Sequence, residues 1–499
     1  MAQTGESRLL SVLRRDYGDH VFKYLDSRDT GRLERTLPRE LVFVAVGAGE
    51  ALLRGVVGRR HAEAAKRAGV QLVPLGELRG ERTTWAMEFL WIDVATVRLR
   101  VGAAKKMISA ADAHSLVTSG TAGGTWTFGT GTNGQLGHGG RGNEVVPRRV
   151  EALNRVVVVQ VGAGAFHSMV LTIGGGILTW GAGGNGQLGH GNTDRQLVPK
   201  RVEGLSTVMA IAAGGQHSLA VGEDGALYTW GYNDVGQLGR LELVATTLAP
   251  TAVPGVNDVV DVAAGDNHSL VLRRDGTVMA CGENVVGQLG IGDMADCDTF
   301  TAVLGLWGAV DIDAGSDHSM AATTEGGLYS WGYGPATGHG GNAQLVPARV
   351  VGGGIEEARV VQVAAGGQHS MALTASGELG SWGRGHKGQL GHGVQEQSRH
   401  VPRVVGGIGE VVGMGGGSQH SLAITAGGRV LVFGSSNGEE QWEDSDGEEL
   451  DDPVFVFDGR LGLGAEVGEA LAPTLIDGIT IGHEVGGGEE GAEGKMGNE

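Results

Sequence analysis

Seven histidines, each followed directly by serine, are the residues whose chemistry must be considered first. Histidine is a common metal ligand and general base, and serine is a common nucleophile. The pairs begin at intervals of 53, 50, 51, 50, 51 and 51 residues. These histidines are His114, His167, His217, His268, His318, His369 and His420.

A structural role is the simpler interpretation of these histidines, because each unit of a repeat places its histidine in the same position. Seven equivalent positions around a ring lie too far apart to share one metal ion, whose bonds to histidine nitrogen are about 2.0–2.1 Å. Buried polar groups need partners, so we expect each imidazole to be hydrogen-bonded to backbone between strands.

The remaining residues indicate no ordinary active site. Four more histidines fall in a glycine-rich turn of the repeat, and the other five form no cluster with ligand spacing. Paired carboxylates, a nucleophile elbow and a phosphate-binding loop do not stand out. We therefore expect a protein that is not an enzyme and holds no metal or cofactor. Exchange-factor activity stays open as an alternative.

Three further modules recur with the histidines and define seven units of about 51 residues. An aromatic residue followed by glycine comes thirteen or fourteen residues after each histidine, with Cys281 in its place in the fourth unit. A GQLG turn follows, shortened to TGHG in the fifth unit, and then a Val-Pro or Ala-Pro module, with Phe300 at the proline position of the fourth unit. This period, with short apolar segments between Gly, Asn and Asp, suits a propeller blade.

The predicted fold is an all-β, seven-bladed β-propeller over residues 105–481. We expect a small α-helical module at 1–104 before it and a disordered tail at 482–499 after it. Glycine is 93 of 499 residues, which fits turns that need positive φ. The last Pro module, at 473–478, has no His-Ser strand after it, so we expect the chain end to pair with the chain start and complete the ring.

Composition and charge exclude several classes of protein. No run of about 18 uncharged apolar residues is present and the N-terminus lacks an apolar signal core, so we expect neither a membrane protein nor a secreted one. Two cysteines cannot make a disulfide framework, which favours the cytosol or nucleus. Residues 1–104 carry 17 Lys and Arg against 13 Asp and Glu, whereas the remainder carries 21 against 44. Direct nucleic-acid binding by this acidic part is not expected.

The repeat resembles that of the regulator of chromosome condensation family. The family signature is small-small-glycine, two variable residues, histidine, a small residue and an apolar one. Residues 211–221 (IAAGGQHSLAV) and 363–373 (VAAGGQHSMAL) match it position by position. Family members include a guanine-nucleotide exchange factor for the GTPase Ran, a plant UV-B photoreceptor, and propellers attached to ubiquitin ligases. The resemblance implies a propeller that binds protein partners, but it does not identify the partner.

The resemblance also points to candidate partner-binding residues just before the repeat histidines. In the exchange factor, acidic residues at these positions contact the GTPase, and a hairpin wedge displaces the nucleotide. Such a wedge is not evident, because the loops after Trp230, Cys281 and Trp382 are equally short. The tryptophans that the photoreceptor carries before its histidines are absent here. The candidates are Asp112, Phe166, Gln216, Asp266, Asn267, Asp317, Gln368 and Gln419.

The N-terminal segment and one insertion lie outside the repeat. Residues 21–34, VFKYLDSRDTGRLE, resemble part of an F-box, a helical module that docks a ubiquitin-ligase adaptor, although the usual Leu-Pro is missing. Val21, Phe22 and Leu25 are the candidate adaptor-docking residues; the alternative is a helical cap on the propeller. An acidic insertion at 437–453 in the last blade is expected to be a disordered loop, and a docking segment for a basic partner is the alternative.

We therefore predict a non-enzymatic protein-interaction scaffold, which could serve as a substrate-binding receptor of a ubiquitin ligase. The alternative is a guanine-nucleotide exchange factor for a Ran-like small GTPase. The partner is expected to be a protein bound on one face of the propeller, either a cullin-ligase adaptor or a small GTPase, with no direct nucleic acid and no membrane.

Overall fold

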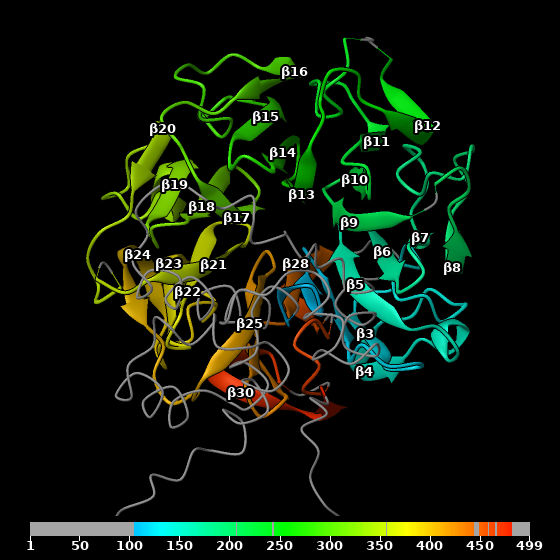
Figure 1. The fold of residues 1–499 in the computed structure, drawn as a ribbon. Coiled ribbons are helices and arrows are strands. Elements are labelled where there is room, and N and C mark those ends of the chain that lie inside the picture. The colour runs from blue at the N-terminus through cyan, green and yellow to red at the C-terminus, as the bar shows by residue number, and fades with distance from the viewer. Residues whose placement is uncertain are drawn as a thin grey trace, which may run out of the picture. The chain divides into compact units, whose positions relative to one another are not determined.

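A computed structural model describes residues 104–205, 207–241, 244–355, 357–443, 449–457, 459–464 and 467–481. The chain divides into two units, Met1–Val97 and Arg98–Glu499, and all described residues belong to the second. They form seven four-stranded antiparallel sheets arranged as blades of a ring (Figure 1). The predicted seven-bladed propeller is thus confirmed. The predicted N-terminal helical module lies outside the described residues.

Each blade follows the chain from the axis outward, so the repeat unit and the blade nearly coincide. The innermost strands are β1 (Ile108–Ala110), β5 (Val158–Ala163), β9 (Val208–Ala213), β13 (Val259–Ala264), β17 (Ala309–Ala314), β21 (Val360–Ala365) and β25 (Val411–Gly416). The second strands are β2 (His114–Thr118), β6 (His167–Thr172), β10 (His217–Gly222), β14 (His268–Arg273), β18 (His318–Thr323), β22 (His369–Thr374) and β26 (His420–Thr425).

The outer half of each blade contains the aromatic-glycine step and the Pro module. The third strands are β3 (Thr125–Gly129), β7 (Ile177–Gly181), β11 (Leu227–Tyr232), β15 (Val278–Gly282), β19 (Leu328–Gly332), β23 (Leu379–Gly385) and β27 (Arg429–Ser435). The outermost strands are β4 (Glu144–Arg149), β8 (Gln196–Arg201), β12 (Thr246–Ala252), β16 (Cys297–Ala302), β20 (Gln344–Arg349), β24 (Glu396–Val404) and β30 (Glu469–Thr480). Two single-turn helices, η4 (Glu151–Leu153) and α6 (Gly334–Thr337), lie in connections.

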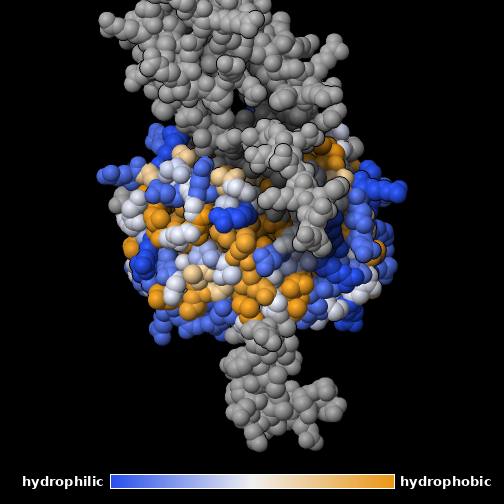
Figure 2. All heavy atoms as spheres, turned by 90° about the horizontal axis from the view of Figure 1, so that it is seen from below, coloured by the Kyte–Doolittle hydropathy of each residue, from blue (hydrophilic) through white to orange (hydrophobic). Residues whose placement is uncertain are grey.

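The outermost strands carry exposed apolar residues, and they also carry prolines that disfavour pairing with a strand of another chain. Val401 and Leu475 are 44% and 42% exposed, and Figure 2 shows apolar residues among charged ones on one side of the molecule. Pro402 and Pro473 lie within these strands, where a missing N–H weakens pairing with another chain. Six of the seven blades carry such a proline, which explains why this module recurs.

The seven repeat histidines join neighbouring blades in a closed circle. Each Nε2 lies 2.7–3.0 Å from the serine Oγ of the next His-Ser pair, and His420 returns to Ser115. Each serine Oγ donates to a backbone carbonyl, as Ser218 does to Gln187, so it accepts from the imidazole Nε2–H. The expected partner was backbone; the direct partner is instead the neighbouring serine, which passes the bond on to backbone.

The aromatic residues and glycines of the repeat form the seams between blades. Trp230 is fully buried and its Nε1 donates to the carbonyl of Gln187 in the preceding blade at 2.9 Å. Gly189, at φ 74°, lies against this ring, and a Cβ there would come within 2.8 Å of Nε1. The GQLG turn thus needs glycine both for its backbone conformation and for the space that the indole takes.

Ring closure differs from the expectation that the two chain ends would share a blade. β30 pairs with β27 of its own blade, and β1 pairs with β2, so each blade is continuous in sequence. Blade 7 instead packs beside blade 1: a Cβ at Gly462 would contact the Phe128 ring, and the Gly464 N–H donates to the Val145 carbonyl at 2.9 Å. Closure therefore uses the same side-to-side packing as every other seam.

One seam replaces its tryptophan with two smaller residues. Cys281 occupies the tryptophan position of blade 4 and is fully buried. Phe300, at the proline position of β16, is 8% exposed and lies where a Cβ on Gly239 would be 2.3 Å from its ring. In the neighbouring seams, a tryptophan fills this space above the glycine. The two departures noted in the sequence therefore compensate for each other.

Candidate functional site

All eight candidate partner-binding residues lie at one end of the ring, in the turns that join each innermost strand to the second strand. We call this end the His-turn face. Loops between the third and outermost strands lie beside these turns, since the Tyr232 N–H donates to the Gln216 carbonyl and the Ser435 N–H donates to the Gln419 carbonyl, both at 3.0 Å. The other end of the ring carries the connections between blades, which include Asp258 before β13 and Trp307 before β17.

The candidates separate into two circles around the axis. Residues two positions before the histidine line a small axial cavity of about 60 Å³, and among them are Asp112 and Asp266 together with Ser316 and Ser418. Residues directly before the histidine are not among those that line this cavity. They are Phe166, Gln216, Asn267, Asp317, Gln368 and Gln419.

The inner circle brings two carboxylates together at the axial mouth. The pKa of Asp112 is raised to about 6, mainly by burial and also by the Asp266 carboxylate, while Arg460 offsets part of this rise. Burial also raises the pKa of Asp266, partly offset by a hydrogen bond from Ser316. The pKa of Asp317 is raised by burial and then by Asp266 and Glu283. Carboxylates with raised pKa values in one cleft favour the approach of a cation.

Hydrogen bonds fix several side chains of the outer circle. Asn185 donates to the Gln216 side chain, and Arg384 donates to the Gln368 Oε1 at 2.5 Å. Asn267 lies 3.5 Å from Glu283. Phe166 is 40% exposed, so it presents an apolar surface on this face.

The sequence interpretation missed Glu283 and Arg384, which add charge to this face. Both directly follow an aromatic-glycine step or its Cys281-Gly282 equivalent, a position that bonds to the turn before the histidine in each case. The residue that follows this glycine could therefore have been identified from the sequence as a candidate partner-binding residue. With these two residues, the His-turn face has four acidic side chains and one basic side chain on blade 6, that of Arg384. The acidic residues are Asp112, Asp266, Asp317 and Glu283.

The acidic insertion emerges on the same face and is not an irregular loop throughout. β28 (Asn437–Glu443) pairs with β29 (Glu449–Phe457) in an antiparallel hairpin that begins two residues after β27 ends. The expectation of a disordered loop was therefore wrong for these backbone segments. The equally short loops after Trp230, Cys281 and Trp382 gave no hint of it, because the hairpin belongs to another blade.

The described residues offer neither a metal centre nor a membrane-spanning helix. Among them, no group of three or more His, Cys, Asp or Glu side chains is arranged to hold a metal ion. No described helix is long and apolar enough to cross a membrane. The candidate adaptor-docking residues Val21, Phe22 and Leu25 lie outside the described residues.

Comparison with known proteins agrees with this geometry. Residues 75–353 match the model of the RCC1-like domain, and residues 360–389 and 376–424 match models of the regulator of chromosome condensation (RCC1) repeat. The chain is 33% identical over 383 residues to the E3 ubiquitin-protein ligase HERC2 of Homo sapiens, covering 74% of this chain and 7% of that protein. It is 33% identical over 337 residues to the ultraviolet-B receptor UVR8 of Arabidopsis thaliana, covering 66% of this chain and 64% of the receptor.

Among solved structures, Prp20p of Saccharomyces cerevisiae, described with its binding to Gsp1p and histones, superimposes with a TM-score of 0.61. The identity is 22%, and the match covers 75% of this chain and 89% of that one. This likeness concerns the fold. The chain thus spans about two thirds of the receptor and a small part of the ligase it matches.

Proposed function

Because the chain belongs to the family of proteins with an RCC1-like domain, we propose that it is a non-enzymatic interaction propeller that binds a protein partner on its His-turn face. The partner would present a positively charged loop to the axial mouth. We also propose a location in the cytosol or nucleus, because two cysteines cannot make a disulfide framework. The relatives with an RCC1-like domain support a role in protein binding or in nucleotide exchange in general.

The observation that carries this proposal is the charge of two carboxylates that form no ion pair among the described residues. Asp266 and Asp317 form no ion pair with another residue of the described chain, whereas Asp112 is partly offset by Arg460. Carboxylates held in partly buried positions on the His-turn face are costly to the free protein and gain when a cation arrives. Long-range attraction of this kind also speeds the encounter of two proteins.

The test is affinity capture from native extract with the full chain, compared across matched variants. Asp266→Asn and Asp317→Asn together should abolish capture of the partner, while Asp258→Asn should leave it unchanged. Asp258 is an exposed carboxylate in the connection before β13, at the opposite end of the ring, so it controls for net charge. Equal capture by the double variant and the control would refute binding through the His-turn face.

A finer proposal is that the partner is presented to a ubiquitin ligase. The likeness to a ubiquitin ligase and the F-box-like pattern of residues 21–34 support it. Replacing Val21, Phe22 and Leu25 by alanine should remove a cullin-ligase adaptor from the captured proteins and retain the partner of the His-turn face. Retention of the adaptor by this variant would contradict the F-box-like role.

The second candidate is nucleotide exchange on a Ran-like GTPase, and the β28–β29 hairpin favours it. A hairpin on the partner-binding face is a feature that could displace a nucleotide, and Prp20p offers the same fold. Purified full chain should then accelerate release of fluorescent GDP from the GTPase. Deleting 437–457 should abolish the acceleration, and Asp266→Asn should reduce it. No acceleration by the wild-type chain would exclude this candidate.

A further inference from the structure

The chain places a lysine inside the axial channel just before blade 1 begins. A turn at residues 104–107 is closed by a hydrogen bond from the Met107 N–H to the Ala104 carbonyl at 3.1 Å. Ala104 is 2% exposed and packs at Gly413 of blade 7, where a Cβ would come within 2.8 Å of the Ala104 backbone. Gly413 therefore leaves the space through which this turn enters the ring.

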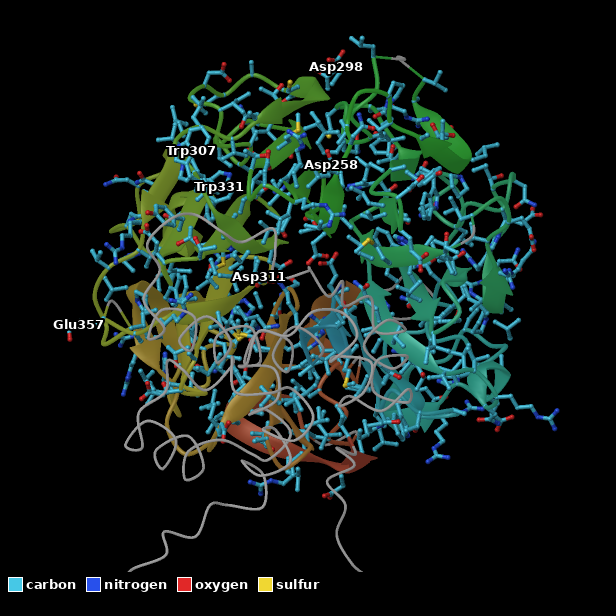
Figure 3. The ribbon with its side chains drawn as sticks, viewed as in Figure 1. Asp258, Asp298, Trp307, Asp311, Trp331 and Glu357 are labelled. Atoms are coloured by element: carbon cyan, nitrogen blue, oxygen red, sulfur yellow. The ribbon has the colours of Figure 1, made fainter. Side chains whose placement is uncertain are left out.

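The ammonium group of Lys105 meets a complete set of acceptors on blade 5. Its Nζ lies 3.0 Å from both Asp311 carboxylate oxygens and 2.9 Å from the Ile312 carbonyl oxygen. An ammonium group has three N–H donors and no acceptor, so these three oxygens match it. Figure 3 shows Asp311 close to the centre of the ring.

The surrounding groups hold the site ready for a cation. Asp311 Oδ2 accepts from the Val363 N–H at 2.7 Å, and Asp313 Oδ2 accepts from the Ala365 N–H at 3.1 Å, so blade 6 fixes both carboxylates. Burial by itself lowers the pKa of Lys105, but the carboxylates of Asp311, Asp313 and Asp261 raise it above its ordinary value. The lysine is therefore charged in the channel.

These carboxylates depart from the repeat at the place where the lysine enters. The positions equivalent to Asp311 in five other innermost strands are Gln160, Ala210, Asp261, Gln362 and Gly413. Gln160 uses its amide to bond the Ile211 backbone of the next blade, at 2.7 and 3.2 Å, and needs no cation. Asp313 stands where the equivalent residue is Gly or Ala in five innermost strands and Ser109 in blade 1. Charge is thus concentrated on blades 4 and 5, facing Lys105.

We propose that the axial channel contains a binding site for a primary alkylammonium group, formed by Asp311 and the Ile312 carbonyl and flanked by Asp261 and Asp313. Lys105 is its tethered occupant, and it links blade 1 to blade 5 across the channel. A cavity of about 140 Å³ lined by Lys105, Lys106, Asp261 and Asp313 adjoins the site. This volume is enough for several waters or a small ammonium ion once the lysine side chain is removed.

The experiment is chemical rescue of the full chain carrying Lys105→Ala. Removing one partner of a largely buried ion pair leaves the other charge uncompensated, so the folding equilibrium constant should fall at least tenfold. The removed part of the side chain corresponds to n-propylammonium. Millimolar n-propylammonium should restore most of the loss in a saturable way, and n-propanol should not. Rescue should be absent in Lys105→Ala with Asp311→Asn. Equal effects of n-propylammonium and n-propanol would overturn the site.

A second measurement needs no variant and keeps the proposal testable if Lys105→Ala does not fold. Reductive methylation of the native full chain, read by mass spectrometry, should modify Lys105 at least tenfold more slowly than Lys106. Lys106 is the matched control, because its Nζ is 3.9 Å from Asp261 and its side chain is 31% exposed, against 18% for Lys105. Equal rates for the two lysines would show that Lys105 does not occupy the site.

Discussion

Mild acid should unfold the propeller through its seven buried histidines. Burial lowers the pKa of these imidazoles far below 6.5, to about 3 for His114, His167, His217 and His318 and to about 4 for His268 and His369. For His420 burial lowers the pKa well below 6.5 as well. Each Nδ1 is buried and has no hydrogen-bond partner in the described part of the chain, so a protonated ring would place an unpaired N–H in a dry seam.

The sign and size of the effect follow from proton linkage. A histidine with a lowered folded pKa contributes stability above the unfolded pKa of 6.5, and that contribution is lost as the pH falls from 6.5 toward 3 or 4. At pH 5.5 an unfolded histidine is about ten-elevenths protonated, which costs the fold about 1.4 kcal/mol per histidine. Seven histidines amount to about 10 kcal/mol, and unfolding takes up about six protons.

Five described carboxylates with raised pKa values, those of Asp112, Asp266, Asp311, Asp313 and Asp317, oppose this trend but do not cancel it. Burial raises the pKa of Asp112 and Asp311 to about 6, so their contribution to stability is lost as the pH rises through 6 and is regained on acidification. Each returns less than about 1 kcal/mol between pH 7 and pH 5.5. The five carboxylates together return less than the seven histidines lose, so the net loss of several kcal/mol is comparable to the whole stability of a typical folded domain, about 5–15 kcal/mol.

The assay is urea unfolding of the full chain followed by tryptophan fluorescence at pH 7.5, 6.5 and 5.5. Trp180, Trp230, Trp331 and Trp382 are fully buried in seams, so their emission reports on the blades directly. We expect the urea midpoint to fall steeply below pH 6.5 and the native signal to be lost by about pH 5. A midpoint that is the same at pH 7.5 and pH 5.5 would refute the argument from buried neutral histidines.

Three other predictions concern the blades and the seams between them. Phe300→Ala should destabilise the chain by about 3–5 kcal/mol because it opens a cavity above Gly239. The control Trp307→Ala, at a residue that is 76% exposed, should change stability by less than about 0.5 kcal/mol. Equal urea midpoints for these two variants would contradict the packing argument. Cys281→Trp alone should also destabilise by overpacking, and adding Phe300→Pro, which restores the repeat, should recover most of that loss in the same assay. Gly231→Ala should cost at least about 1 kcal/mol, since φ is 104° and the new Cβ would lie 2.6 Å from the Gln216 carbonyl oxygen; a wild-type melting temperature for this variant would disprove the claim.

The fold could be predicted from the sequence because the same pattern of strands and turns recurs in seven repeat units. The spacing of about 51 residues places the serine of the next His-Ser pair one blade away from each histidine. The hydrogen bond between the imidazole and this serine could therefore have been predicted from the sequence. Cys281 and Phe300 were both visible as departures, but only the seam shows that one fills the space left by the other.

The sequence was less informative where the chain stops repeating. The Lys105–Asp311 pair joins residues 206 positions apart, and neither lies in a recurring motif, so spacing carried no information about it. Ring closure failed as a prediction for a related reason. Counting modules does not say whether a terminal strand completes its own blade or a neighbour's, and the register of β30 with β27 decides this.

Departures from the repeat can be sorted by whether the molecule itself compensates for them. Phe300 compensates for Cys281, and Lys105 balances Asp311, so these changes serve the ring. The carboxylates of Asp266 and Asp317 stand at variable positions of the repeat, and no cation of the described chain forms an ion pair with either of them. A folded protein gains nothing from uncompensated buried charge unless something outside it supplies the counterion. This asymmetry is the physical reason for placing the partner on the His-turn face.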